Sequence, residues 1–224
     1  MDNHEYAALE SYMNKKMQDS AHDKHHVYRV LNGALDIANH ETDVDTDVLI
    51  AACLLHDIGR EEQFTNPQQC HAQVGGKMAY EYLISRGWHT EKALHVKQCI
   101  AAHRYRGESP PQSIEAKILF DADKLEAAGL IGIARTLIYG GQVQEPLYIL
   151  DKCGSIITDG GGADISSFFQ EYNFKLKNIY HLFFTNRAKA IAMERQQSAV
   201  DFYERLHAEI TKNYEIDINI GTIP

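Results

Sequence analysis

The sequence predicts an all-α fold, and three observations support this prediction. Apolar residues recur at helical spacing through most of the 224 residues, only five prolines occur, and no hairpin turn joins a pair of alternating segments. With 44% hydrophobic positions and a formal net charge of −9, the composition is that of an ordinary globular chain. We therefore expect helices packed around one core.

The first half of the chain is predicted to hold a buried helix surrounded by amphipathic ones. Residues 48–57 are apolar on nearly every face, follow the acidic Asp47 and end before Gly59, which is typical of a central helix. The neighbouring segments carry an apolar stripe on one face only, so they should lie on the core. These amphipathic helices are expected at 5–17, 23–40, 69–86 and 90–103.

The second half continues the helical pattern around one glycine-rich connector. Residues 153–163 should form a loop, residues 214–220 are left unassigned, and the aromatic residues between 168 and 184 recur at helical spacing and should lie in the core. Helices are expected at 114–128, 130–138, 165–184 and 187–211. We expect one domain over 1–224, with a catalytic core at about 20–145, a helical cap at about 146–211 and a short tail at 212–224.

Composition also argues against several classes of function. An acidic chain lacks the basic field that nucleic-acid and anionic-membrane binders need. The longest apolar run, 48–55, is too short for a bilayer, and the N-terminus has no signal-peptide pattern, so we expect a cytoplasmic protein. The cysteines lie far apart with no CxxC, which favours reduced thiols over disulfides or zinc. They are Cys53, Cys70, Cys99 and Cys153.

Two segments imitate known motifs without completing them. Three aspartates within 43–47 begin like a calcium loop, but Val48 stands where that loop needs glycine and Leu54 where it needs glutamate. An acidic helix N-terminus explains the aspartates better. Residues 160–162 are three glycines without the GK[ST] of a phosphate-binding loop, so we interpret them as a connector.

The functional signal is a set of histidines and aspartates, drawn from an unusual total of twelve histidines. His56 and Asp57 stand together at the end of the apolar helix, where an imidazole and a carboxylate need a partner to be buried. His26 lies at the edge of the apolar stripe of its own helix and can face the same interior. A metal ion is one partner that would bring such residues together.

A fourth ligand is available from the segment that contains Asp121 and Asp123. Helical phase makes both carboxylates equally buried, so periodicity does not decide between them. Two imidazoles and two carboxylates suit a divalent ion of borderline hardness, with Mn²⁺ the first expectation and Ni²⁺, Co²⁺, Fe²⁺, Zn²⁺ or Mg²⁺ as alternatives.

The order His26, His56-Asp57, Asp123 resembles the H…HD…D signature of the HD-domain metal-dependent phosphohydrolases. The resemblance covers most of residues 20–200. Within the family, the sequence resembles one bacterial subfamily, whose members hydrolyse nucleoside triphosphates to monophosphate and pyrophosphate. Alignment of the ADKL segment selects Asp123 as the fourth ligand. The segments that carry it are AHDKHHVYRV, AACLLHDIGR, HAQVGGKMA, IAAHRYRG, EAKILFDADKLEAAGLIGIAR and KLKNIY…TNRAKAIAMER.

The resemblance also bears on residues outside the ligand set. His71 and His103 are expected to contact substrate or act as acid or base, with a second metal site or a structural role as alternatives. Lys124, beside Asp123, is expected to reach a phosphate, and Asp57 counts among the catalytic residues. The expected substrate-binding cations are Arg29, Arg60, Arg104, Lys124 and Arg135.

The resulting prediction is a metal-dependent hydrolase of (deoxy)nucleoside triphosphates whose partner is a small nucleotide. The alternatives are another HD phosphohydrolase, either a nucleotide phosphodiesterase or a monophosphatase, and a nucleotide sensor without turnover. The GYP extension of cyclic dinucleotide hydrolases is absent, which disfavours that branch. The sequence leaves the oligomeric state open, a homo-oligomer included.

Overall fold

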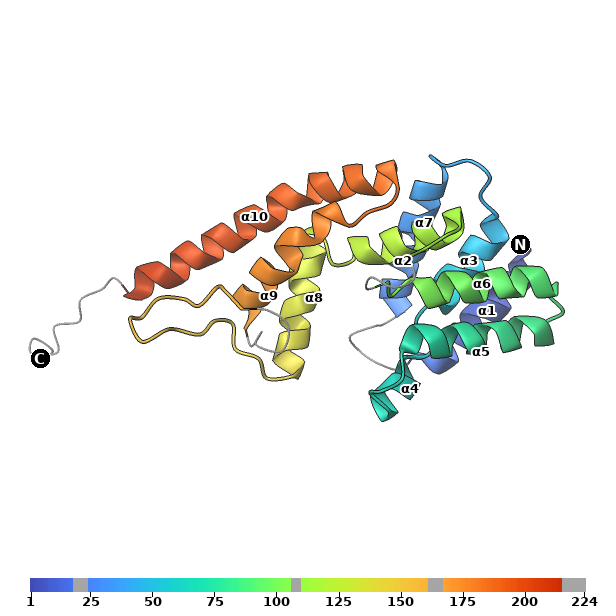
Figure 1. Cartoon of the computed structure of the whole chain (residues 1–224), viewed down its shortest axis with the longest axis horizontal. Helices are drawn as coiled ribbons and strands as arrows, with labels where there is room; N and C mark the ends of the chain where they lie inside the picture. Colours follow the sequence, from blue (N-terminus) through green and yellow to red (C-terminus); the bar gives the residue numbers. More distant parts are fainter. Residues whose placement is uncertain (18–23, 106–109, 161–166, 215–224) are drawn as a thin grey trace, which may run out of the picture. The chain divides into compact units, whose positions relative to one another are not determined.

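The computed structural model describes residues 1–17, 24–105, 110–160 and 167–214, and it confirms the all-α prediction (Figure 1). Within these ranges the regular structure is helical apart from one antiparallel bridge, between Leu150 and Ile156. None of the helices there is both long and apolar enough to cross a bilayer. The chain divides into unit 1, residues 1–126 with 183–190, and unit 2, residues 127–182 with 191–224.

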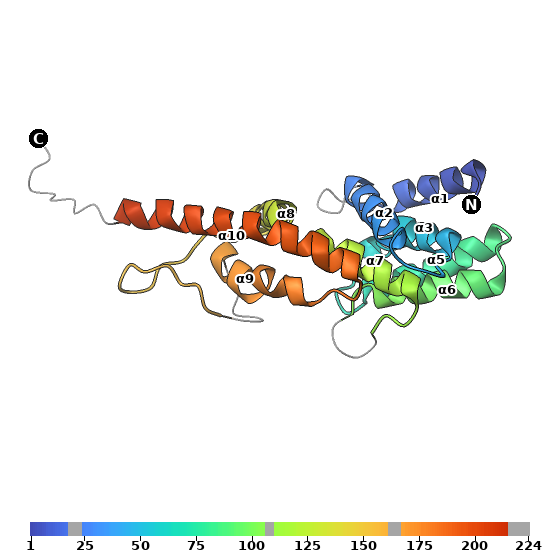
Figure 2. The same ribbon diagram turned by 90° about the horizontal axis from the view of Figure 1, so that it is seen from above.

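Unit 1 is built around helix α3 (Thr46–Leu55), as the apolar run predicts. The seven residues from Val48 to Leu55 other than Ile50 are completely buried, and α3 contacts five other helices of the unit. Figure 2 shows α3 among these neighbours, with α5 and α6 side by side. The other helices are α1 (Asn3–Lys16), α2 (Lys24–Ala38), α4 (Arg60–Thr65), α5 (His71–Ser85), α6 (Thr90–Ala102) and α7 (Ile114–Leu125).

The acidic segment before α3 caps that helix. The Asp45 carboxylate accepts hydrogen bonds from the backbone N–H groups of Asp47 and Val48, at 3.1 and 3.2 Å. Lys92 contacts the same carboxylate at 2.8 Å. These contacts satisfy helix donors that would otherwise lack partners, so the interpretation of the aspartates as a helix N-terminus is confirmed.

The end of α3 lies directly against the start of α5. A Cβ added to Gly59 would come within 2.4 Å of the His71 carbonyl oxygen and 2.5 Å of the Gly75 nitrogen, closer than real Cβ contacts allow. Gly59 has φ −92°, which any residue adopts, so the need for glycine arises from this close backbone approach alone. The contact fixes the segment after His56-Asp57 against the helix that begins at His71.

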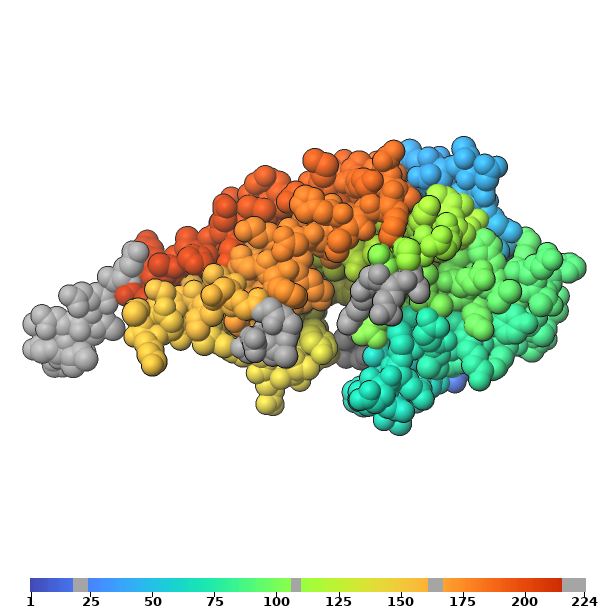
Figure 3. Space-filling view, in the orientation of Figure 1, coloured from blue at the N-terminus to red at the C-terminus, as the bar shows by residue number. Residues whose placement is uncertain are grey.

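The sequence did not predict α4, which immediately follows Gly59. Its six residues are mostly polar, and its one large apolar side chain, Phe64, is 91% exposed, so no apolar stripe reveals the helix. In the space-filling view this segment lies at the molecular surface (Figure 3). The helix matters because it carries Gln63 to the edge of the site described below.

Unit 2 has its own core, formed by α8 (Gly129–Gln142), α9 (Phe168–Phe174), the 3-10 helix Leu176–His181 and most of α10 (Asn186–Tyr214). Phe168, Phe169 and Tyr172 are buried there, and Tyr172 stacks on Tyr203 with ring centroids 4.0 Å apart. The core role predicted for these aromatic residues is therefore confirmed.

The prediction of one continuous helix over 165–184 is wrong. Helix α9 stops at Phe174 and a 3-10 helix follows. Asn178 donates hydrogen bonds to the carbonyls of Asn173 and Phe174, which replaces the regular helical pattern at this point. Residues 153–160 contain no helix, as expected for the loop, whereas 161–166 and the tail beyond 214 lie outside the described residues.

Candidate metal centre

Helix α3 delivers His56 and Asp57 to the interior of unit 1, where both are completely buried. His56 is the C-cap of the helix, and its Nδ1 donates to the Cys53 carbonyl at 2.8 Å. A carbonyl oxygen only accepts, so the ring proton lies on Nδ1 and the Nε2 lone pair is directed away from the helix. Burial lowers the pKa of His56 to about 4, which keeps the imidazole neutral at pH 7.

Three other elements bring ligand atoms to that lone pair. His26 Nε2, from α2, lies 3.3 Å from His56 Nε2 and 3.3 Å from Asp123 Oδ1, which α7 carries. Asp57 Oδ2 completes the group at 3.6 and 3.5 Å from the same two nitrogens. Ligand atoms about 2.0–2.2 Å from one divalent ion have separations of this order. The structure thus brings together all four predicted ligands.

Asp57 faces a second group with its other oxygen. Oδ1 lies 3.6 Å from the Nε2 atoms of both His71 and His103, and those two nitrogens are 3.2 Å apart. His71 is the first residue of α5 and His103 is the C-cap of α6. The two additional histidines of the sequence therefore form a triad with Asp57, the second triad; the first triad is His26, His56 and Asp123, and each of them could hold a metal ion.

Hydrogen bonds at Nδ1 orient all four imidazoles. His103 Nδ1 donates to the Ile100 carbonyl at 2.6 Å, and His71 Nδ1 donates to Gln63 Oε1 at 2.5 Å. His26 Nδ1 lies 3.2 Å from a carboxylate oxygen of Glu126. With the proton on Nδ1, a neutral ring presents only a lone pair at Nε2, so the lone pairs of His71 and His103 oppose each other. A cation between them removes that repulsion, which is a direct indication that the residues fit a metal.

The two oxygens of Asp57 give a second indication of fit. Both are buried, and neither has a hydrogen bond of good geometry within the described residues. Arg60 Nε is 2.6 Å from Oδ2 as an ion pair. Burial alone would raise the pKa of Asp57, but the charges of its neighbours hold it well below the ordinary value. The group remains an ionised carboxylate with acceptor capacity to spare, as a metal ligand requires.

Protonation differs between His26 and His71. Burial would lower the pKa of His26, but contacts with Asp123 and Glu126 raise it above the ordinary value, so a metal there competes with a proton. Burial and the nearby charge of Arg60 lower the pKa of His71 to about 3. His71 therefore holds no second proton near pH 7 and is better suited to bind a cation than to donate a proton.

The structure separates the two aspartates that helical phase left equivalent. Asp121 points to the start of α10 and accepts hydrogen bonds from the backbone N–H of Phe184 at 2.9 Å and of Thr185 at 2.7 Å. The Thr185 hydroxyl also donates to it at 2.7 Å. Asp123 points to the histidines instead. Asp121 is therefore an internal link of unit 1, and Asp123 belongs to the candidate centre.

The predicted substrate cations have different surroundings. Arg29 donates to Glu126 at 2.8 Å and Arg60 pairs with Asp57, so both cations balance carboxylates of the centre. Lys124 lies over the Phe120 ring, 5.0 Å from its centroid. Arg104 reaches the edge of the second triad through Gln63, at 3.3 Å. Arg135 is in α8 of unit 2 and is not among the residues that unit 1 assembles.

Sequence reasoning missed two residues that contact ligand histidines. Glu126, the C-cap of α7, accepts a hydrogen bond from Arg29 and lies 3.2 Å from His26 Nδ1, and its position three residues after Asp123 was an available signal. Gln63 orients His71 from a short polar helix and gave no signal in the sequence.

Cys70 immediately precedes His71, and its thiol has a shifted pKa. Burial alone would raise this pKa, but the N–H groups of Gln73 and Ala72 and the Arg104 side chain lower it below the ordinary value.

Comparison with known proteins adds independent information. A model of the HD domain matches residues 24–128. The uncharacterized protein YpgQ of Bacillus subtilis is 28% identical over 197 residues, which is 86% of each chain. A crystal structure of YpgQ in complex with ADP covers 92% of this chain and 97% of its own, with a TM-score of 0.71 at 24% identity. The match to a structure of an HD-superfamily hydrolase from Bacillus thuringiensis covers 93% of this chain and 97% of the hydrolase, with a TM-score of 0.70 at 26% identity.

Another relative is named for a different activity. The 3'-5' exoribonuclease YhaM of Halalkalibacterium halodurans is 26% identical over 143 residues. The match covers 57% of this chain but only 45% of YhaM, so more than half of that protein has no counterpart in the match.

Proposed function

We propose that this chain is an HD-domain hydrolase, because the HD-domain model matches residues 24–128 and a solved HD-superfamily hydrolase is 26% identical, and that it hydrolyses (deoxy)nucleoside triphosphates to monophosphate and pyrophosphate with a divalent metal. One observation carries the metal-dependent part: two pairs of histidine Nε2 atoms lie beside the two buried oxygens of Asp57, neither of which accepts a hydrogen bond of good geometry within the described residues. The substrate class is supported by the subfamily resemblance of the sequence and by the ADP complex of YpgQ.

The metal in this proposal is a single ion, Mn²⁺ as first choice, held by His26, His56, Asp57 and Asp123. When bound, it supplies a Lewis acid that activates water and neutralises charge on a phosphate oxygen. Glu126 orients His26, and the Cys53 carbonyl orients His56. These contacts hold the ligands in place before the ion arrives, so little reorganisation accompanies binding.

The second triad has two roles consistent with its geometry. His103 is our candidate for protonating the leaving group, whereas the low pKa of His71 argues against His71 as that acid. A second ion between His71, His103 and Asp57 is the alternative, supported by the opposed lone pairs. Lys124 is proposed to contact a phosphate, because it directly follows Asp123 in α7.

Hydrolysis of RNA or of another phosphodiester is the competing activity. The YhaM relatives carry an exoribonuclease name, but this chain matches less than half of the YhaM protein. A net charge of −9 provides no general field for a long polyanion. A small nucleotide held by local cations fits this charge better, so we place phosphodiester hydrolysis second and a sensor without turnover third.

The test identifies products. The protein is incubated with each dNTP and Mn²⁺, and the products are separated by ion-exchange chromatography, with Asp57→Asn as the inactive control. Monophosphate and pyrophosphate are expected. Inorganic phosphate with nucleoside diphosphate, or tripolyphosphate with nucleoside, would contradict attack at the α-phosphorus. Release of mononucleotides from an RNA oligomer at a higher rate than from any dNTP would favour the competing activity, and absence of turnover on every substrate would favour the sensor.

A further inference from the structure

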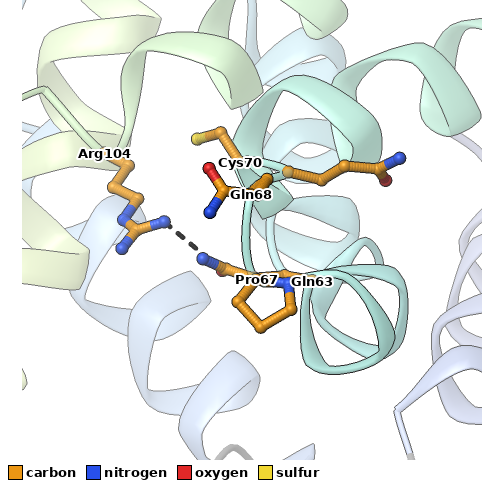
Figure 4. Close-up of a pocket in the computed structure, with 6 residues that line it drawn as sticks. Gln63, Pro67, Gln68, Cys70 and Arg104 are labelled. Carbon is orange, nitrogen blue, oxygen red and sulfur yellow. Dashed lines mark hydrogen bonds between the residues drawn. The ribbon is translucent and has the colours of Figure 1, made fainter.

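A small cavity of about 270 Å³ lies beside Gln63, the residue that orients His71 of the second triad (Figure 4). Its walls come from α4, from the segment that leads into α5 and from the end of α6. The volume is below the roughly 300–1,000 Å³ of sites that enclose a whole drug-sized ligand, so it suits one part of a nucleotide. The lining residues are Gln63, Pro67, Gln68, Gln69, Cys70 and Arg104.

The chemistry of this lining favours an anion. It contains one cation and three amide side chains, with neither a carboxylate nor an aromatic ring. Arg104 is half-buried, and within the described part of the chain no Asp or Glu pairs with it, whereas Arg29 and Arg60 each pair with a carboxylate. A phosphate group fits such a surface better than a nucleobase, which needs a stacking partner.

The cavity is connected to the candidate centre through one hydrogen-bonded chain. Arg104 Nη1 donates to Gln63 Oε1, and the same oxygen accepts from His71 Nδ1. His71 Nε2 then faces His103 and Asp57. Arg104 is therefore linked through Gln63 to the imidazole whose Nε2 atom faces the centre.

We propose that this cavity, with Arg104 as its cation, holds the pyrophosphate end of a nucleoside triphosphate. This assignment rests on the proposed function, because it presumes that the α-phosphorus lies at the centre. Water adds to the α-phosphorus, the bond to the bridging oxygen breaks, and pyrophosphate leaves with that electron pair. The oxygen and one proton of the water stay with the monophosphate, and the other proton goes to pyrophosphate or solvent. Arg104 stabilises the charge that develops on the departing group.

Cys70 lies in the cavity wall and provides a direct readout of occupancy. Its thiol is partly exposed, Cys153 is exposed in unit 2, and Cys53 and Cys99 are buried. The full-length protein with excess Mn²⁺ is alkylated with iodoacetamide at increasing concentrations of inorganic pyrophosphate, and each cysteine is followed by peptide mass spectrometry. Pyrophosphate should slow alkylation of Cys70 while Cys153 reacts at an unchanged rate.

Two variants make the test specific. Arg104→Ala should weaken the pyrophosphate protection of Cys70 by about tenfold or more, as expected for the loss of a hydrogen bond to a charged group. Lys77→Ala removes one positive charge from the exposed face of α5 and should leave the protection unchanged. Equal protection in Arg104→Ala and the unmodified protein, or no protection at pyrophosphate concentrations that inhibit turnover, would overturn the assignment.

The result separates this inference from the proposed function. Protection of Cys70 that depends on Arg104 would support the cavity as a pyrophosphate site even if no dNTP gives monophosphate and pyrophosphate. Conversely, correct products without protection would overturn the cavity assignment and leave the proposed reaction standing.

Discussion

Asp121 and Asp123 are separated by one residue on α7, yet they have different partners. Asp121 accepts three hydrogen bonds from Phe184 and Thr185, so removal of its charge affects the packing of unit 1. Asp123 faces His26 at 3.3 Å and has few other contacts to lose. The pair offers a matched comparison between structural and ligand carboxylates on one helix.

Asp123→Asn is expected to reduce metal affinity by more than about 100-fold, because loss of a mere supporting contact already costs about 10–100-fold. Asp121→Asn should retain metal binding but lower the free energy of unfolding by about 1–3 kcal/mol, since a buried amide faces N–H donors there. Metal content and thermal unfolding of both proteins provide the measurements. Full metal occupancy in Asp123→Asn would show that the ligand set is wrong.

The sequence predicted the histidines and aspartates of the site, but it did not predict the residues that orient them. His26, His56, Asp57, Asp123, His71 and His103 were all named from the chain, and unit 1 brings all six together. The supporting residues Glu126 and Gln63 were not named: the spacing of Glu126 from Asp123 was a signal that the prediction did not use, whereas the hydrogen bond between His71 and Gln63 leaves no periodic trace.

At the scale of elements, the central helix and its neighbours were predictable and the irregular segments were not. The composition of an apolar run such as 48–55 is enough to predict that it is buried, and seven of its eight residues are 0% exposed. Helix α4 and the break after α9 depend on local side-chain-to-backbone bonds and on glycine contacts, which periodicity does not register. Helix α4, at the edge of the site, was therefore missed.

The close contact between the ends of α3 and α5 leads to a prediction. Gly59→Ala should lower the free energy of unfolding by about 1–3 kcal/mol, because the added methyl group meets backbone atoms that cannot move independently. Gly33→Ala is the control, since its Cβ would meet only the Ala122 side chain at 3.9 Å and helix propensity favours alanine by about 1 kcal/mol. Thermal unfolding of both variants tests this, and a Gly59→Ala protein as stable as the original would contradict the contact.

At the scale of the whole molecule, the chain passes between the two units three times, after residues 126, 182 and 190. Residues 183–190 return to unit 1, where Asp121 binds Phe184 and Thr185. Helix α10 thus begins in one unit and continues in the other. The expected boundary near residue 145 differs from this division, and the single cooperative domain stays a prediction.

We expect one unfolding transition, since neither unit is a continuous segment with its own ends. Trp88, the single tryptophan, lies in unit 1 and donates to Glu5 at 2.8 Å, so its fluorescence reports on that unit. Circular dichroism reports on the helices of both. The two signals should change at the same temperature. A loss of helix without a change in Trp88 fluorescence would identify unit 2 as an independent domain.

The four histidines differ in the acceptors of their Nδ1 hydrogen bonds, and this difference determines which imidazoles a substitution elsewhere can reorient. His56 and His103 donate to main-chain carbonyls, which are present whatever side chains occupy positions 53 and 100. His26 and His71 depend on the side chains of Glu126 and Gln63, which a single codon change replaces. Natural variation and directed evolution can therefore adjust the basicity and orientation of His26 and His71 separately, while the other two imidazoles keep their orientation as long as their helices form.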